Sequence, residues 1–381
     1  MRTDMKSLRI SASVLKVLLG MMFVISAVSK FITIDAFEMY VFSFGLFPLS
    51  VSLFLARLVL SVELVLGAAL ISHRHHRFTV LSALLFLLCF IVFLVYAHLI
   101  GRTDNCHCFG DLMPFDPLQS IVKNAVLVVL LLFVYKYALT DWAPRWWLSL
   151  VVCLLTALAM LLYMVKSLHA IDILSFVLLL VVMAVCIVAS FSFHSRWYVT
   201  AMLVAAPFVA TFILTPPDNW FYNDTNSPFD KELFLSQLSG IDEGDSSYNV
   251  AITDSSSVPL GPALHELGLG EGRHLVAFFS PGCGYCRLAA GKIAAMAKRH
   301  DLPEEGIIYV FPQVKNASSY DNFYAESRSP RYRQSVIDKN LFVHITRGAF
   351  PTVLLIEADT VAASLSYRDI NENLINEFFE L

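Results

Sequence analysis

Charged residues are scarce in this chain. Only 15% of its 381 residues are charged and 57% are hydrophobic, a composition that excludes an ordinary soluble globular protein. No basic stripe runs along the sequence, which excludes nucleic acid as a partner. The chain also lacks an internal repeat and any long low-complexity tract.

Cysteine is sparse in the polar C-terminal part. Of seven cysteines, only Cys283 and Cys286 lie beyond residue 217. A disulfide scaffold would spread its cysteines through that part, so redox work is favoured over structural stapling. A second close pair, Cys106 and Cys108, lies in a short polar loop between two apolar runs. The others, which sit inside apolar runs, are Cys89, Cys153 and Cys186.

The charges that are present divide the chain in two. Residues 1–217 hold 14 Lys and Arg against 9 Asp and Glu, whereas residues 218–381 hold 13 against 22. A weakly basic membrane part therefore precedes an acidic soluble part.

Long apolar runs dominate the first part. A bilayer-spanning helix needs about twenty apolar residues. Because six further runs follow the first one, we do not interpret it as a secretory signal, although Ala27-Val28-Ser29 resembles a weak cleavage site. The sequence predicts about seven transmembrane helices over Leu8–Phe31, Leu49–Ser72, Phe78–Ile100, Gln119–Leu139, Trp146–Val165, Ile171–Phe191 and Trp197–Leu214.

The distribution of Lys and Arg predicts the orientation. Only Lys30, Arg102 and Lys166 lie in or beside loops on one side of a seven-span arrangement. Since basic residues favour the cytoplasmic side, we expect a cytoplasmic N-terminus in a bacterial inner membrane and a periplasmic C-terminal domain. Both cysteine pairs then face the periplasm. The basic residues on the other side are Arg2, Lys6, Arg9, Arg74, Arg77, Lys136, Arg145 and Arg196.

The C-terminal part reads as a polar tether followed by an α/β domain. The composition changes after Thr215-Pro216-Pro217, and a short helix is expected at Phe229–Leu238. Alternating patterns then predict a β-α-β unit followed by a β-β-α unit. The expected elements are strands at His274–Ser280, Ile307–Phe311, Val353–Glu357 and Val361–Tyr367, and helices at Cys283–His300, around Tyr320–Lys339 and at Ile370–Phe379.

The Cys283-Gly284-Tyr285-Cys286 pair follows a hydrophobic strand and opens a helix. Free backbone N–H groups at a helix start favour a thiolate, so we expect Cys283 to attack and Cys286, one turn away, to resolve. A zinc site is the alternative, but no second ligand pair is evident.

Together with Phe350-Pro351-Thr352 before a strand, this motif resembles the thioredoxin superfamily over residues 245–381. The dipeptide between the cysteines, Gly284-Tyr285, resembles that of the periplasmic disulfide isomerases. The resemblance implies that Pro351 is a cis-proline beside the pair. Where thioredoxin has a buried acid, this chain has Ala277.

The Cys106-His107-Cys108 loop is a rarer kind of pair. A disulfide across one residue closes a small strained ring, and strain makes the bond easier to reduce, which suits exchange. His107 could tune the thiols. Two reduced thiols, or a copper or zinc site that includes His107, are the alternatives.

Residues 16–139 resemble the MauE/DoxX-like membrane family. The resemblance rests on Leu19-Gly20-Met21-Met22-Phe23, Ser26, Lys30-Phe31, Gly45-Leu46-Phe47-Pro48, Glu63-Leu64-Val65-Leu66-Gly67, Cys106-His107-Cys108-Phe109-Gly110 and Lys123-Asn124. It implies a four-helix redox-associated module linked to the maturation of disulfide-rich periplasmic proteins, with methylamine dehydrogenase the namesake.

Glu63 lies in the middle of the second expected span, and Arg57 lies nearer its outer end. A carboxylate at that depth is costly unless it is paired, protonated or in a polar cavity. A supporting functional role and a structural hydrogen bond to a neighbouring helix both remain open. Cys153 and Cys186 could form a relay pair, but cysteine in an apolar helix is more often a packing residue.

The domain organisation follows from these patterns. Residues 1–140 form a MauE/DoxX-like four-helix domain, residues 141–217 add three spans, and residues 218–381 hold the tether and a thioredoxin-like domain. We expect a membrane-bound thiol–disulfide oxidoreductase, in which the two cysteine pairs exchange electrons and periplasmic thiol proteins are the substrates. A net oxidant would need a membrane electron acceptor, most simply a quinone. The alternative is a copper-handling or assembly factor that uses the Cys-His-Cys loop.

Overall fold

The computed structural model describes residues 2–72, 76–102, 106, 115–138, 208–213, 227–240, 258–358 and 360–380. The chain divides into two compact units, which are described separately below. The first comprises residues 1–41 and 50–216, and the second comprises residues 42–49 and 217–381.

Four long apolar helices form the described part of the first unit, and each is long enough to cross a membrane. This confirms the first four expected spans. The three further spans lie outside the described residues, apart from residues 208–213, which are helical. The long helices are α1 (Arg2–Ile32), α3 (Leu49–Ser72), α4 (His76–Leu99) and α5 (Pro117–Tyr137), and a short helix α2 (Ile34–Phe42) follows α1.

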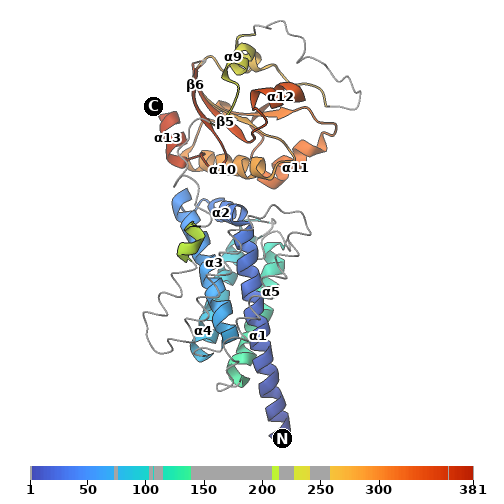
Figure 1. The fold of residues 1–381 in the computed structure, drawn as a ribbon, viewed down its shortest axis with the longest axis vertical. Coiled ribbons are helices and arrows are strands. Elements are labelled where there is room, and N and C mark those ends of the chain that lie inside the picture. The colour runs from blue at the N-terminus through green and yellow to red at the C-terminus, as the bar shows by residue number, and fades with distance from the viewer. Residues whose placement is uncertain are drawn as a thin grey trace. The chain divides into compact units, whose positions relative to one another are not determined.

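The four helices run alongside one another (Figure 1). Gly20 on α1 and Gly67 on α3 allow a close approach, because a Cβ on Gly67 would lie 2.9 Å from the carbonyl oxygen of Gly20. Helix α5 starts at a complete N-terminal cap: the Asp116 side chain accepts a hydrogen bond from the Gln119 backbone nitrogen, and Pro117 takes the first helical position. The side chains of α5 that face the bundle include Ser120, Asn124 and Leu127, which are buried.

A five-stranded mixed sheet with the order β4-β3-β2-β5-β6 forms the centre of the second unit. β2 pairs parallel with β3 and β3 with β4, whereas β5 and β6 are antiparallel additions. The strands are β2 (Arg273–Phe278), β3 (Ile307–Pro312), β4 (Arg333–Ile337), β5 (Thr352–Glu357) and β6 (Thr360–Leu365).

Helices cover both faces of this sheet, because alternate residues of each strand point to opposite sides. Val276 and Phe278 of β2 pack in one core with Phe234 and Phe342 from α9 and α12. On the other face, the Phe279 ring contacts that of Phe323 on α11, and α10 and α11 lie on that side in Figure 1. The remaining elements are α9 (Lys231–Ser239), η1 (Leu264–Leu267), α10 (Gly284–His300), η2 (Glu304–Gly306), α11 (Ser318–Ser327), α12 (Lys339–Ile345) and α13 (Glu372–Glu380).

One expectation is wrong. The region around Tyr320–Lys339 was expected to be helical, but only α11 follows that pattern, and residues 333–337 form β4, which pairs with β3. Helical spacing of Tyr320, Phe323 and Tyr324 holds in α11, and Pro330 cannot continue a helix. Only three of the five β4 residues are buried, so the strand lacks a clear alternating signal.

Candidate active site

Cys283 is the N-cap of α10, at the junction between the β2 strand region and the helix. Its backbone is extended, and its sulfur accepts a hydrogen bond from the Cys286 backbone nitrogen at 3.3 Å. Its own backbone nitrogen donates to the Ser280 carbonyl at 3.0 Å. The sulfur therefore lies among the N–H groups at the helix start that carry partial positive charge.

The two thiols differ in environment and in acidity. Both are free, but Cys283 is half-buried and Cys286 is completely buried. The Cys286 side chain hydrogen-bonds to Cys283 and, with the backbone N–H groups of Cys286 and Tyr285 and the charge on Arg287, lowers the pKa of Cys283 to about 6 against the opposing effect of burial. Burial, first, and the neighbouring Cys283 sulfur raise the pKa of Cys286 far above its usual value. Cys283 is thus the thiolate and Cys286 the protonated partner near neutral pH.

The cis-proline loop borders the accessible sulfur. The Phe350–Pro351 peptide bond is cis, and the Cys283 sulfur lies 3.8 Å from the Phe350 carbonyl oxygen. Tyr285, half exposed, packs its ring 5.2 Å from that of Tyr367. The sulfur therefore lies beside the cis-proline loop, and Tyr285, two residues further along the chain, is exposed.

Ala277 is fully buried in β2, on the face opposite the core that contains Val276 and Phe278. Among the described residues, no carboxylate contributes to the acidity of either thiol. The position that sequence comparison suggested for a buried acid therefore supplies only packing.

Cys106 is the described member of the loop pair. It is fully buried and disulfide-bonded, and its partner lies outside the described residues, as do His107 and Cys108. The Cys106 backbone nitrogen donates to the Phe115 carbonyl at 2.9 Å, and its sulfur lies 2.9 Å from the Ser120 hydroxyl of α5. Cys106 is thereby held against the start of α5.

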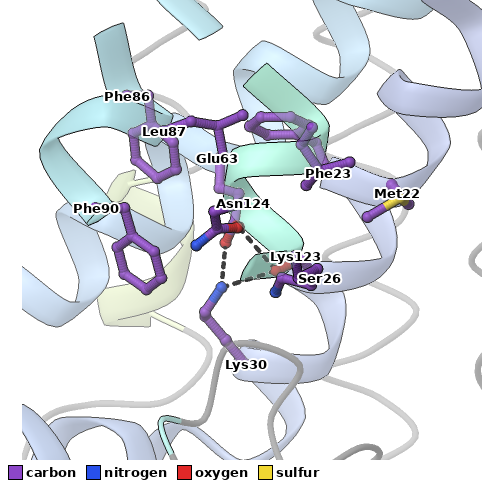
Figure 2. A pocket seen from close by; sticks show the side chains of 11 residues that line it. Met22, Phe23, Ser26, Lys30, Glu63, Phe86, Leu87, Phe90, Lys123 and Asn124 are labelled. Carbon is purple, nitrogen blue, oxygen red and sulfur yellow. Dashed lines mark hydrogen bonds and ion pairs between the residues drawn. The ribbon is translucent and has the colours of Figure 1, made fainter. Parts of the chain in front are cut away.

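A buried ionic cluster surrounds Glu63 in the first unit. Its carboxylate accepts hydrogen bonds from the Ser26 hydroxyl at 2.7 Å and from the Lys30 ammonium at 2.6 Å, and Lys30 also donates to Ser26 at 2.8 Å. Figure 2 shows Lys30 pointing at both partners, with Asn124 beside them. Lys30 and Glu63 are 1% and 9% exposed in their side chains, so the pair is fully enclosed.

This cluster lines a small pocket between the helices. The pocket has room for about one or two water molecules. Lys123 and Asn124 of α5 contribute further polar groups, and Asn124, 2% exposed, has a side-chain nitrogen with no hydrogen-bond partner in the described chain. The apolar lining residues are Met22, Phe23, Phe86, Leu87, Phe90 and Leu127.

Sequence reasoning missed most of this pocket. Lys30 was placed in or beside a loop, but it lies in the last turn of α1 and is buried. The available signal was the four-residue spacing of Ser26 and Lys30, which puts both on one helix face. Arg57 is likewise buried, pairs with Glu38 at 2.7 Å and donates to the Thr211 carbonyl at 2.6 Å.

In the described part of the chain, no group of three His, Cys, Asp or Glu side chains lies close enough to hold an ion. The alternative site with His107 and Cys108, and the proposed relay between Cys153 and Cys186, lie outside the described residues.

Comparison with known proteins agrees with this organisation. Residues 8–137 match the family described as "Methylamine utilisation protein MauE". Protein TlpB of Flavobacterium psychrophilum is 23% identical over 330 residues, which cover 79% of this chain and 76% of that protein.

Two solved structures are similar to about a third of the chain. One is the thioredoxin domain of a thiol-disulfide oxidoreductase from Bacteroides vulgatus, with 18% identity and a TM-score of 0.26, covering 32% of this chain and 93% of that one. The other is a thiol:disulfide interchange protein from a Bacteroides species, also with 18% identity and a TM-score of 0.26, covering 33% and 90%.

The fold and the site thus define a membrane protein that carries, at the start of a helix, a Cys-x-x-Cys pair of unequal acidity. It joins a MauE-like membrane domain to a thioredoxin-like domain.

Proposed function

We propose that the chain catalyses thiol–disulfide exchange in the periplasm, with Cys283 passing electrons to a Cys106–Cys108 disulfide in the same chain. The observation that carries this proposal is that one chain contains both an accessible thiol of low pKa, Cys283, and a disulfide at Cys106. A thiolate is the attacking species in exchange, and a disulfide is the group that it attacks.

Each exchange step balances in electrons. The Cys283 thiolate attacks one sulfur of the Cys106–Cys108 disulfide, an S–S bond forms to Cys283, and the electron pair of the broken bond stays on the leaving sulfur. The Cys286 thiol then loses its proton and attacks Cys283, which releases the loop pair as a dithiol. The raised pKa of Cys286 keeps it protonated until that second step.

The natural substrates in this proposal are periplasmic thiol or disulfide proteins, whose maturation the chain supports by disulfide formation or isomerisation. The Phe350 carbonyl borders the sulfur that such a partner must reach, and Tyr285, two residues from Cys283, is exposed. The Cys106 sulfur is already oxidised, and a thiolate is the form that binds metals, so this state favours exchange over the copper-handling alternative.

A membrane quinone is our proposed final electron acceptor. The loop dithiol would give two electrons to the quinone, which takes up two protons, at least one of them from water, and leaves as a quinol while the disulfide re-forms. Loss of quinone absorbance on adding the reduced full chain tests this step, and a Cys106→Ser chain that reduces quinone equally fast would contradict it.

The exchange itself is tested by trapping its intermediate. Cys286→Ser removes the resolving thiol, so Cys283 should remain linked to Cys106 or Cys108. With a protease site inserted near Asp224, the two fragments of the cut full chain should migrate together without reductant and separate with it. The same chain with Cys106→Ser and Cys108→Ser is the matched control and should show no link. Fragments that separate without reductant after mild oxidation would overturn the proposal.

A further inference from the structure

The ionic cluster around Glu63 is not used by the exchange steps described above. Burying a carboxylate and an ammonium in a membrane bundle is costly, and such groups most often mark a functional site. Three helices, α1, α3 and α5, each contribute polar side chains to the same pocket, and α4 closes it with Phe86 and Phe90 (Figure 2).

A line of buried polar groups runs from Cys106 towards this pocket. The Cys106 sulfur contacts the Ser120 hydroxyl at 2.9 Å. Ser120 and Asn124 are four residues apart on α5 and belong to its buried face, so they lie one helical turn from each other. Asn124 lines the pocket together with Glu63 and Lys30.

The pocket can hold a water molecule between Asn124 and Glu63. It has room for about one or two water molecules, and the Asn124 side-chain nitrogen offers a buried donor that finds no partner in the described residues. A water there would accept from Asn124 and donate to the Glu63 carboxylate. Ser120 and such a water are both groups that pass a proton by accepting one and donating another.

We propose that Glu63 is the base that receives the Cys106 proton when the loop dithiol forms a thiolate. The proton leaves the Cys106 sulfur, moves through the Ser120 hydroxyl and the pocket water, and ends on the Glu63 carboxylate. The same proton returns when the disulfide opens and its leaving sulfur needs one. This inference rests on the proposed function, because it requires the Cys106 pair to be redox-active.

Charge balance explains why Glu63 suits this role. Before the transfer, the Glu63 carboxylate neutralises Lys30; after it, Glu63 is neutral and the Cys106 thiolate carries the negative charge. The total charge inside the bundle does not change: Lys30 keeps its positive charge, and the negative charge moves from Glu63 to Cys106. The charged groups that line the pocket around Glu63 are Lys30 from α1 and Lys123 from α5, and the α4 lining residues carry no charge.

The transfer gives a distinctive pH dependence. If Glu63 takes the proton while the Cys106 sulfur attacks, the reacting form of the protein has an ionised Glu63 and a protonated Cys106. The fraction of this form, and therefore the rate, does not change with pH while both groups stay in those states. Without the base, only the free thiolate attacks. At pH values below the thiol pKa, its fraction rises tenfold for each unit by which the pH increases.

The test uses the full chain with Cys283→Ser and Cys286→Ser, so that only the membrane part reacts. The reduced protein is mixed with glutathione disulfide, and re-oxidation of Cys106 is followed by mass spectrometry between about pH 6 and pH 8. We expect a flat profile in this parent chain. Glu63→Gln should convert it to a rise of about tenfold per pH unit and slow re-oxidation at pH 7 by about tenfold or more.

Matched variants separate proton transfer from a structural role. Glu38→Gln removes a second buried carboxylate, ion-paired with Arg57 but not in the pocket, and should leave the profile flat. Glu63→Asp keeps a base and should also leave it flat. If Glu63→Gln does not fold, Asn124→Leu fills the pocket while sparing the Lys30–Glu63 pair, and it should produce the same tenfold rise per pH unit.

Two failures are distinguishable. If the loop cysteines of the parent chain are not re-oxidised by glutathione disulfide, the proposed function of that pair is wrong. If they are re-oxidised, but neither Glu63→Gln nor Asn124→Leu changes the pH profile, only the proton-acceptor role of Glu63 is wrong. The same loss in Glu38→Gln as in Glu63→Gln would also overturn that role.

Discussion

The Cys283 sulfur lies 3.3 Å from the Cys286 backbone nitrogen, so the attacking thiol is itself the N-cap of the helix that carries its partner. One position thus serves two purposes. A thiolate there accepts the backbone hydrogen bond that a Ser or Asp would accept at an ordinary helix start. The hydrogen bond that caps the helix is therefore also one of the interactions that lower the pKa of Cys283.

The first prediction concerns the acidity of Cys283. In the reduced full chain, alkylation of Cys283 should reach half its maximal rate near pH 6, because the lowered pKa keeps it a thiolate above that pH. Cys286 should stay unreactive there, since its pKa is raised. The measurement is pH-dependent alkylation, resolved for each cysteine by mass spectrometry.

Two substitutions of Cys286 serve as a matched pair for this prediction. The Cys286 side chain contributes most to the lowered pKa of Cys283. Cys286→Ala removes that donor and should move the alkylation profile of Cys283 to higher pH, whereas Cys286→Ser keeps a hydroxyl donor and should move it less. Alkylation of Cys286 before Cys283 below neutral pH would show that the assigned roles are reversed.

The second prediction concerns the ion pair of Arg57 and Glu38. Arg57→Met leaves the buried Glu38 carboxylate unpaired and also removes the bond to the Thr211 carbonyl. The free energy of unfolding in detergent should fall by about 3–5 kcal/mol. Adding Glu38→Met removes the unpaired carboxylate and should restore most of the lost free energy of unfolding.

The exposed Leu81→Ala on α4 is the control for this pair and should change the free energy of unfolding by no more than about 0.5 kcal/mol. A loss below about 1 kcal/mol in Arg57→Met would mean that water or lipid headgroups solvate Glu38 in its place.

The sequence predicted those features that depend on local patterns. The four long helices follow from apolar length alone, and Cys283 and Cys286 follow from a buried strand that leads into a helix. Strand β4 was missed because its pairing with β3 joins residues more than twenty positions apart, and its own residues carry no strand alternation.

The pocket around Glu63 was only half predictable. A carboxylate inside an apolar run is visible in the sequence, so Glu63 could be singled out. Its partner Lys30 is 33 residues away, at the end of a run where a lysine ordinarily marks a loop. Which side chains meet depends on how α1, α3 and α5 are rotated in the bundle, and that rotation is a tertiary property.

The third prediction concerns orientation, which we propose as a cytoplasmic N-terminus and a periplasmic thioredoxin-like domain. The structure removes Lys30 from the basic residues counted against this orientation, because that side chain is buried and paired with Glu63. Of the three exceptions, only Arg102 and Lys166 remain, against eight Lys and Arg on the opposite side.

A reporter enzyme that is active only after export, fused after Leu381, should therefore be active, and the same reporter fused after Arg145 should be silent. A reporter that is active only in the cytoplasm should give the reverse result at both positions. A silent export reporter after Leu381, with the cytoplasmic one active there, would place Cys283 in a reducing compartment and rule out its exchange with a periplasmic disulfide.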